Sequence, residues 1–445
     1  MRFTALFVLL AGVQPAFADC IEDPAGSRNI ACFGFDPDTG IIDPTPDGLT
    51  DSRDGLNVFV DAIDETTGGP GLAINGLTIR GTENDVDLVG VIRVNRSATA
   101  ISGGPDLTVT ITDGTIEGGN GIDVGTASGL TVVSENGTFD VSATAVRGGA
   151  RSRVEGPIFI ERSYTGIDLG EDSEVVSPTV SDGFGGIAYN SLISSGGGAA
   201  VRLGANSNFS IGEGGFVEGR TSDDPNPGTG VELVSGNFFS ESVVLGSGAG
   251  GVGLRITGQS GLTTIDNGFD GVLAGTDYGI LVEGGDANTS LQQVVNFGDL
   301  GNVDLGGGDD TFAVRDANAF TGDSDLGAGD DRLTISNVSS LNDFGLFDGG
   351  AGFDTAEFES FNLMDLFAVR ETSGVLTFEF LEFGMTLPSL FLDLVNFESY
   401  DIGGVVFGDA QLRSAYGLPP AAVPAPATGA MLIVGLGALA LRRRR

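Results

Sequence analysis

Three short runs of glycine and aspartate are the residues in this chain whose types and spacing best suit a defined chemistry. They are Asp304–Asp310 (DLGGGDD), Asp325–Asp331 (DLGAGDD) and Asp348–Asp354 (DGGAGFD), and they start 21 and then 23 residues apart. Glycine permits tight turns with positive φ, which lets backbone carbonyl oxygens turn toward a common point. Aspartate adds hard carboxylate oxygens, and calcium takes about six to eight such ligands. The pattern therefore predicts calcium-binding turns.

The third run contains the full GGxGxD pattern and resembles the calcium-binding RTX nonapeptide repeat. The resemblance covers about 55 residues, and the first two copies differ from it by having Leu305 and Leu326 at the first glycine position. In that family an ion lies between stacked turns, and the last aspartate is the side-chain ligand. The resemblance thus implies these metal ligands and turn glycines: Asp310, Asp331, Asp354, Gly306, Gly308, Gly327, Gly329, Gly350 and Gly352.

A second column of aspartates, formed by Asp304, Asp325 and Asp348, is another candidate ligand set that could equally cap strand ends. Three stacked turns leave two gaps, so we expect about two calcium ions as the cofactor. Carboxylates about 4.8 Å apart repel by about 3.5 kcal/mol at an effective dielectric of 20, which favours a bound cation. The alternative is that these turns are structural and bind no metal.

The elements that would position these turns follow from a longer repeat. A small residue followed by an apolar-x-apolar phrase recurs every 20 to 26 residues, as in Gly166-Ile167-Asp168-Leu169, Gly186-Ile187-Ala188-Tyr189 and Gly253-Leu254-Arg255-Ile256. This period, with many glycines and short turns, predicts an all-β fold, namely a right-handed parallel β-helix. We expect roughly 13 coils between Leu56 and Phe358, a shaft about 60 Å long. The expected inward residues are Ile122, Val124, Ile167, Leu169, Val231, Leu233, Leu254, Ile256, Ile280 and Val282.

Both ends of the chain carry export features. Residues 1–18 form a secretory signal: Arg2, an apolar run, then the small-x-small site Ala16-Phe17-Ala18. Residues 19–55 form a turn-rich cap, and its two cysteines, Cys20 and Cys32, favour one disulfide in an oxidising compartment. The expected order continues with the β-helix at 56–300, calcium turns at 301–358 and closing strands at 359–418. Within the β-helix, residues 221–230 are expected to form a projecting loop.

Residues 419–445 hold a Pro-rich motif, a 15-residue apolar run from Ala427 to Leu441 and four arginines, Arg442 to Arg445. This order resembles the PEP-CTERM sorting signals, especially the VPLPA-type variant, from which it departs at Ala425. The resemblance implies a transmembrane sorting helix that an exosortase-type membrane peptidase removes. The implied motif is Val423, Pro424, Ala425, Pro426 and Ala427. The alternative is an ordinary C-terminal anchor, since arginines halt such a segment at a membrane.

Composition narrows the function. The chain has 61 acidic and 21 basic residues, and this negative charge argues against nucleic acid as a partner. It contains no histidine, lysine or tryptophan. We expect a non-enzymatic structural or adhesive protein of a Gram-negative bacterium, first a membrane-anchored precursor, then on the cell surface or in the extracellular matrix. Extracellular polysaccharide or a cell surface is the expected partner. The alternative is a glycan-cleaving enzyme, whose candidate carboxylate pairs are Asp85/Asp87, Asp223/Asp224 and Asp309/Asp310.

Overall fold

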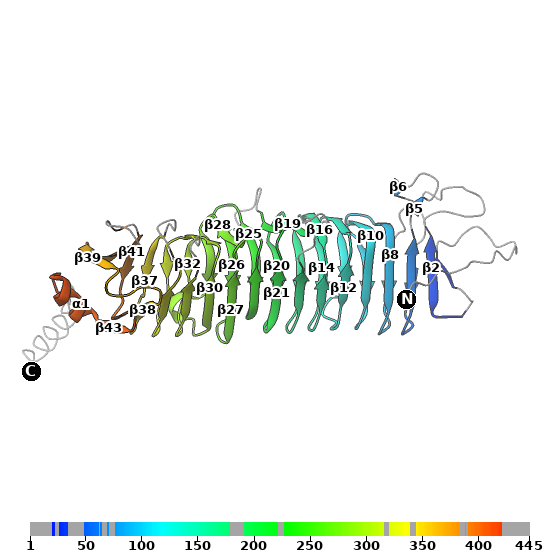
Figure 1. The fold of residues 1–445 in the computed structure, drawn as a ribbon. Helices are drawn as coiled ribbons and strands as arrows, with labels where there is room; N and C mark the ends of the chain where they lie inside the picture. Colours follow the sequence, from blue (N-terminus) through cyan, green and yellow to red (C-terminus); the bar gives the residue numbers. More distant parts are fainter. Residues whose placement is uncertain are drawn as a thin grey trace, which may run out of the picture.

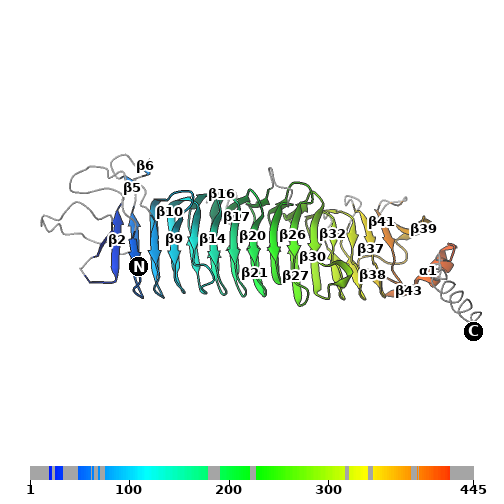
Figure 2. The same cartoon turned by 180° about the vertical axis from the view of Figure 1, so that it is seen from behind.

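The chain folds into a long rod of stacked β-strands (Figure 1), and the same stack is visible from behind in Figure 2. In this computed structural model the described residues are 20–22, 26–33, 49–61, 63–64, 69–70, 76–178, 191–220, 227–315, 320–338, 344–381, 388 and 390–420. Strands dominate, and most pair in parallel with the strand one coil away. The fold is therefore all-β with long parallel sheets, a solenoid-like arrangement.

Within the described residues the larger sheet contains 25 strands and forms two faces of the rod, which share the long strands β8 and β10. Face 1 consists of β1 (Cys20–Glu22), β2 (Asn29–Phe33), β4 (Asn57–Asp61), β8 (Asp85–Arg93), β10 (Thr108–Gly118), β12 (Thr131–Ser134), β15 (Arg153–Glu155), β18 (Glu174–Ser177), β21 (Ser207–Ile211), β24 (Gly236–Ser240), β27 (Leu262–Asn267), β30 (Leu291–Asn296), β33 (Thr311–Val314), β36 (Arg332–Ile335), β38 (Thr355–Phe358), β42 (Ser399–Ile402) and β43 (Val405–Gly408). Face 2 continues from β8 and β10 through β13 (Gly137–Val141), β16 (Ile158–Ser163), β19 (Ser191–Ser195), β22 (Gly215–Gly219), β25 (Val243–Gly246), β28 (Val272–Gly275), β31 (Asp299–Leu300) and β34 (Phe320–Thr321).

The second sheet, face 3, has 16 strands. They are β3 (Leu49–Asp51), β7 (Leu77–Ile79), β9 (Thr99–Gly103), β11 (Asn120–Asp123), β14 (Thr144–Gly148), β17 (Thr165–Leu169), β20 (Ala199–Leu203), β23 (Thr229–Leu233), β26 (Val252–Ile256), β29 (Tyr278–Val282), β32 (Val303–Asp304), β35 (Ser324–Asp325), β37 (Leu346–Asp348), β41 (Leu390–Val395), β40 (Val375–Phe380) and β39 (Leu366–Thr372). The remaining elements are β5 (Ile63–Asp64), β6 (Gly69–Pro70), the 3-10 helix η1 (Gly285–Ala287) and the helix α1 (Asp409–Tyr416).

The predicted core and coil number are confirmed, but the separate coil expected from the phrase at 186–189 is wrong, because Ile167 of β17 pairs directly with Val201 of β20. All ten expected inward residues are buried, with at most 6% of each exposed. They lie in register on face 3, where Val231, Leu254 and Ile280 are successive Cα partners. Face 1 has thirteen strands from β4 to β38, one per coil, as expected. The apolar-x-apolar phrase works because alternate side chains of a strand point to opposite faces.

Each phrase must begin with a small residue for a steric reason. A Cβ added at Gly166 would lie 2.4 Å from the carbonyl oxygen of Ala200, and one at Gly230 would lie 2.6 Å from that of Gly253. The backbone of the next coil therefore occupies the space that a larger side chain would need. This contact explains why the repeat is visible in the sequence.

Antiparallel strands close the N-terminal end. Strand β1 pairs antiparallel with β2, and Cys20 lies directly opposite Cys32. Cys32 is disulfide-bonded, and Cys20 is the chain's other cysteine. Strand β2 already pairs in parallel with β4, so the stacked coils begin inside the segment expected as a cap. The guanidinium of Arg53 donates to Asp51 and to the Ser27 carbonyl, which ties the first turns together.

The C-terminal end closes with the expected strands and with a helix that the sequence analysis did not predict. Strands β39, β40 and β41 pair antiparallel on face 3, and β43 pairs antiparallel with β42 on face 1. Inside, Phe358 packs against Phe378 and Phe380 with ring centroids 5.1 and 5.3 Å apart. Helix α1 packs on this end, where Arg413 pairs with Glu371 of β39.

Several predictions lie outside the described residues. They are the signal at 1–18, the phrase at 186–189, the pair Asp223/Asp224 and the tail from residue 421, including the sorting motif. Among the helices that the structure describes, none is both long and apolar enough to cross a membrane.

Candidate metal centre

The three Gly/Asp turns stack on one edge of the rod, each joining face 3 to face 1. They connect β32 to β33, β35 to β36 and β37 to β38, and residues 307, 328 and 351 form parallel bridges between them. Gly327 has φ 97°, and a Cβ on it would lie 1.5 Å from the Gly306 carbonyl oxygen. The corresponding distance at Gly352 is 1.6 Å, to the Gly329 oxygen. These glycines are required because the stacked turns touch through their backbones.

The departure from the RTX pattern at the first glycine position also has a structural reason. Leu305 and Leu326 occupy that position in the first two turns, and both are fully buried in the core. In the third turn the position is Gly349, where a Cβ would lie 2.5 Å from the Asn396 carbonyl oxygen and 2.9 Å from the Asp354 Cβ. The closing strand leaves no room there, so only this copy needs glycine.

The final aspartates of the turns form an inner ladder. The Asp310 backbone N–H donates to Oδ1 of Asp331 at 2.7 Å, and the Asp331 N–H donates to Oδ1 of Asp354 at 2.8 Å. All three side chains are buried. Each carboxylate thus reaches back one coil, and the three implied ligands are brought together in one column.

Two residues that the sequence analysis missed complete the ladder. At one end the Gln292 N–H donates to Oδ1 of Asp310 at 2.7 Å. The Gln292 side-chain amide also lies against this oxygen, and with its oxygen and nitrogen exchanged the nitrogen donates to it at 2.8 Å. At the other end the Asp354 N–H donates to Oε2 of Glu398 at 2.8 Å. Gln292 precedes Gln293, the Cα partner of Thr311 in β33, and Glu398 precedes Ser399, the Cα partner of Thr355 in β38. The strand register therefore places both residues in the column of the turn aspartates.

This inner column runs far beyond the turns. At the equivalent position upstream, the Ser152 N–H donates to Oγ of Ser173, and the Ser173 N–H donates to Oγ of Ser207, both at 3.1 Å. A serine hydroxyl therefore satisfies the same backbone group without charge. Aspartate adds a negative charge and a second oxygen, and the backbone ladder requires neither of them.

That second oxygen lacks a partner in two of the three turns. Oδ2 of Asp331 and Oδ2 of Asp354 are buried and accept no hydrogen bond. Burial raises the pKa of Asp310 and of Asp331 to about 7 and that of Asp354 to about 6, and backbone N–H donors oppose the shift. An ionised carboxylate with an unpartnered buried oxygen needs a proton or a cation beside it. The donor chemistry therefore fits a hard cation.

The outer aspartates belong to a second column, on face 3. Upstream, this column alternates in charge from coil to coil in the order Asp123, Arg147, Asp168, Arg202, Glu232, Arg255. The Arg202 and Glu232 side chains pair at 3.0 Å, and Arg147 lies 3.7 and 3.5 Å from the aspartates on either side. Each carboxylate in that part of the column has a cationic neighbour.

After Leu281 the same column continues with three aspartates and no arginine. Asp304, Asp325 and Asp348 are successive Cα partners. Asp325 is exposed, but partial desolvation in the turn raises its pKa, and the charges of Asp348 and Asp304 raise it further. The Gly306 N–H donates to Asp304 at 3.1 Å and the Gly350 N–H to Asp348 at 2.9 Å, so these carboxylates also fix the turns. Asp304 and Asp348 therefore do have the strand-capping role that the sequence left open. The column still carries negative charge that no arginine within it compensates.

The described side chains do not form a closed metal cage. Within the described residues, no group of three or more His, Cys, Asp or Glu side chains is arranged to hold a metal ion. The carbonyl oxygens of Gly306 and Gly327 accept N–H groups from the next turn at 2.9 and 2.7 Å. A cation here would therefore rely on carboxylate oxygens and on the free lone pairs of turn carbonyls.

We predict that the calcium-free protein loses stability as the pH rises from about 4 to about 7. The inner carboxyls have folded-state pKa values of about 6 to 7, above the value near 3.9 of unfolded aspartate. The folded state then holds more protons across this range, so the free energy of unfolding falls with pH and levels off above 7. Urea unfolding in EDTA at pH 5.5, 6.5 and 7.5 measures this. A stability that rises with pH across these points contradicts it.

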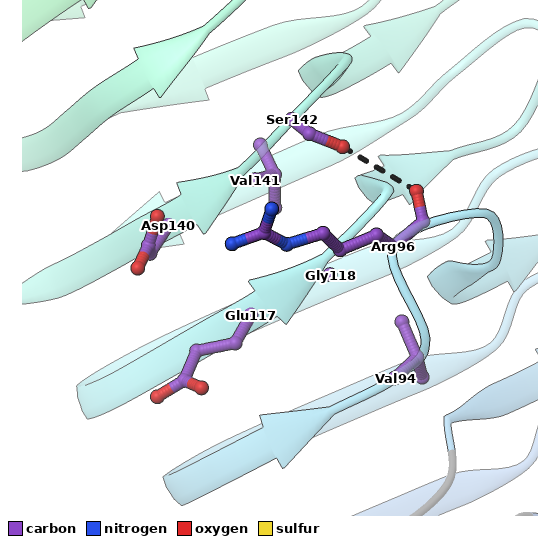
Figure 3. A pocket seen from close by; sticks show the side chains of 7 residues that line it. All are labelled: Val94, Arg96, Glu117, Gly118, Asp140, Val141 and Ser142. Carbon is purple, nitrogen blue, oxygen red and sulfur yellow. Dashed lines mark hydrogen bonds between the residues drawn. The ribbon is translucent and has the colours of Figure 1, made fainter.

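A separate pocket lies on face 2, near the N-terminal end (Figure 3). Its volume is about 400 Å³, and its lining includes Arg96, Glu117, Asp140 and Ser142. Glu117 and Asp140 are Cα partners on neighbouring coils, and the Arg96 side chain extends across the pocket beside Gly118. The sequence analysis did not single out these residues, because they are far apart in the chain and follow no motif.

The described carboxylate pairs predicted for catalysis lie elsewhere. Asp309 and Asp310 belong to the first turn, where the exposed Asp309 accepts the Asp330 N–H at 3.0 Å and the buried Asp310 joins the inner ladder. Asp85 and Asp87 both lie on β8, where burial and the Asp85 charge raise the pKa of Asp87. Neither pair lines the face 2 pocket.

Comparisons of the chain with protein-family models, with curated proteins and with solved structures gave no significant match.

Proposed function

We propose that this chain is an exported, non-enzymatic surface or matrix protein: a right-handed parallel β-helix whose C-terminal coils are stabilised by about two calcium ions. The proposed handedness follows from the strong preference of parallel crossovers for the right-handed form. The proposed structural or adhesive role rests on the rod shape and the strongly acidic composition. The disulfide at Cys32 supports export, because such bonds persist in oxidising compartments.

The observation that carries the calcium proposal is the inner ladder of Asp310, Asp331 and Asp354. Serine performs the same backbone role upstream, so three consecutive buried aspartates are an excess of charge that packing does not require. The arginine-free outer column beside them adds to that excess. Divalent cations between the turns would offset much of this charge, and hard carboxylate and carbonyl oxygens are what calcium prefers.

Thermal unfolding with and without calcium tests this proposal. Extracellular calcium sites often bind at about 10⁻⁴ to 10⁻³ M, so millimolar calcium should raise the melting temperature over that in EDTA. A tenfold excess over Kd stabilises by about 1.4 kcal/mol per site. Magnesium should have a much smaller effect, because it requires near-octahedral geometry and retains its water ligands. An unchanged melting temperature in calcium counts against metal binding at the turns.

Processing of the chain provides a further prediction. The mature protein should begin near Asp19 and end at or near Val423–Ala427, because the flanking segments resemble a signal peptide and an exosortase substrate. Intact-mass measurement of exported material decides this. Retention of Arg442 to Arg445 would identify a plain anchor. Fractionation into membrane, matrix and medium with an antibody to the mature part locates the product.

One observation favours the second candidate function, a glycan-cleaving enzyme. The pocket in Figure 3 places Glu117 and Asp140 on adjacent coils as Cα partners, and glycosidases use a pair of carboxyl groups that flank the scissile bond. A reducing-sugar assay on acidic and neutral polysaccharides tests it. Activity that disappears in both Glu117→Gln and Asp140→Asn would support the enzyme and contradict the structural proposal.

A further inference from the structure

Large apolar side chains are exposed together at the C-terminal end of the rod. Leu363 and Met364 are 37% and 91% exposed, Phe367 is 49% exposed, and Val405 and Val406 are 42% and 62% exposed. They come from the turn before β39, from β39 and from β43. We call these five residues the end patch. On a chain with 61 acidic residues, a group of exposed apolar side chains indicates an interaction site.

The two parts of the end patch, residues 363–367 and 405–406, approach each other at the turn between β42 and β43. The turn between β42 and β43 packs on the segment that precedes Leu363: a Cβ at Gly403 would lie 2.6 Å from the Phe361 carbonyl oxygen and 3.1 Å from the Asn362 Cα. Val405 begins β43 two residues after Gly403, and Phe367 follows Met364 by three residues. The two segments therefore start close together, and from there β39 and β43 run along either side of helix α1, so all five apolar side chains lie at the C-terminal end of the rod.

The chain leaves the rod at this same end. Helix α1 packs against β39 and β43 (Figures 1 and 2). Arg413 of α1 pairs with Asp409 and Glu371, each at 2.8 Å. The Arg413 guanidinium also donates to the Pro419 carbonyl at 3.3 Å, and the Leu418 N–H donates to the Arg413 carbonyl at 2.8 Å. The last described residues are thus held to the rod beside the end patch.

The length of the following chain limits what can lie next to this end. Six residues, 421–426, separate Pro420 from the uncharged run Ala427–Leu441. Six residues span at most about 21 Å when fully extended. If that run is inserted in a membrane, the end of the rod therefore lies close to the bilayer surface.

We propose that the end patch docks on the lipid bilayer and holds the anchored precursor with its C-terminal end against the membrane. This inference rests on the proposed membrane-anchored precursor. The chain contains no lysine, and Asp365, Asp401 and Asp409 lie next to the patch in sequence. Contact is therefore through apolar side chains in the interfacial region, without attraction to anionic headgroups.

Tryptophan fluorescence tests the proposal directly, because the natural chain contains no tryptophan. The full-length chain is reconstituted in phosphatidylcholine vesicles as single-tryptophan variants Met364→Trp and Phe367→Trp. The matched control is Phe269→Trp, at an exposed position (64%) in the turn between β27 and β28, away from this end. We expect a blue-shifted emission for both patch variants and at least twofold stronger quenching by brominated phosphatidylcholine than for the control. Replacing a third of the lipid with phosphatidylglycerol should not increase the quenching.

The other outcomes overturn the proposal in distinguishable ways. A chain that does not float with vesicles lacks the anchor itself, so both the proposed precursor and the docking fail. A chain that floats but shows equal quenching at the patch and control positions retains its anchor while the docking fails. A blue shift without vesicles that grows with protein concentration identifies a second copy as the occupant. One that is independent of concentration identifies the chain's own tail.

Discussion

Replacing Leu254 with aspartate should unfold the central coils of the rod. Leu254 is fully buried on β26, between Val231 and Ile280 in the neighbouring coils. The change removes a core side chain and buries a carboxylate without a partner, which together cost about 5 kcal/mol or more. Circular dichroism should show lost strand signal at 25 °C or a melting temperature lower by about 10 °C or more.

Leu281→Asp is the matched control for this substitution. Leu281 lies one coil away on the same sheet, but it points outward in the charged column and is the Cα partner of Arg255. An aspartate there gains Arg255 on one side and Asp304 on the other, so attraction and repulsion offset at a partly exposed position and stability should change little. Equal damage from both substitutions would show that the inward and outward positions of the phrase are wrongly assigned.

Replacing Asp331 with serine should remove most of the calcium response while leaving the fold intact. Serine occurs at the equivalent position in Ser173 and Ser207, where its hydroxyl accepts the N–H of the preceding coil. The variant keeps that acceptor but loses the charge and the unpartnered Oδ2. Asp331 is the middle of the three aspartates and borders both gaps, so its loss affects both proposed ions. We expect the calcium-induced rise in melting temperature to fall by more than half.

Asp330→Ser serves as the control in the same turn. Asp330 is exposed, and its carboxylate accepts the Phe353 N–H at 2.9 Å. It belongs to neither column, so its loss should leave most of the calcium response in place. In EDTA at pH 7.5, Asp331→Ser should be at least as stable as the natural chain, because it removes one charge from the ladder. A full calcium response in Asp331→Ser would exclude the inner ladder as the site.

The repeat phrase was sufficient to predict parallel stacked coils, their number and the inward residues, although the phrase at 186–189 marks no coil of its own. Its signal is local and strict, because residues such as Gly166 touch the backbone of the next coil and Ile167 fills the core. Helix α1 was missed because its sequence, DAQLRSAY, is short and its position depends on Arg413 pairing with Glu371, 42 residues earlier in the chain. Such a long-range ion pair leaves no periodic trace in the sequence.

The candidate site was only partly predictable. The Gly/Asp turns predicted Asp310, Asp331 and Asp354, and their alignment in one column follows from one turn per coil, at spacings of 21 and 23 residues. Gln292 and Glu398 could not be identified, because neither lies within a turn motif and only the register brings them to the ends of the ladder. The alternating charges of the outer column were present in the repeat phrases, yet their meaning required knowing which residues are neighbours.

Calorimetric titration of the EDTA-treated, dialysed mature protein with calcium chloride at pH 7.5 is the most direct test of the central claim. We predict saturable binding of about two ions with Kd of about 10⁻⁴ to 10⁻³ M, proton release that increases as the pH is lowered to 6.5, and little heat from magnesium. The absence of saturable calcium binding would contradict the claim and leave the aspartates as a proton-linked backbone ladder.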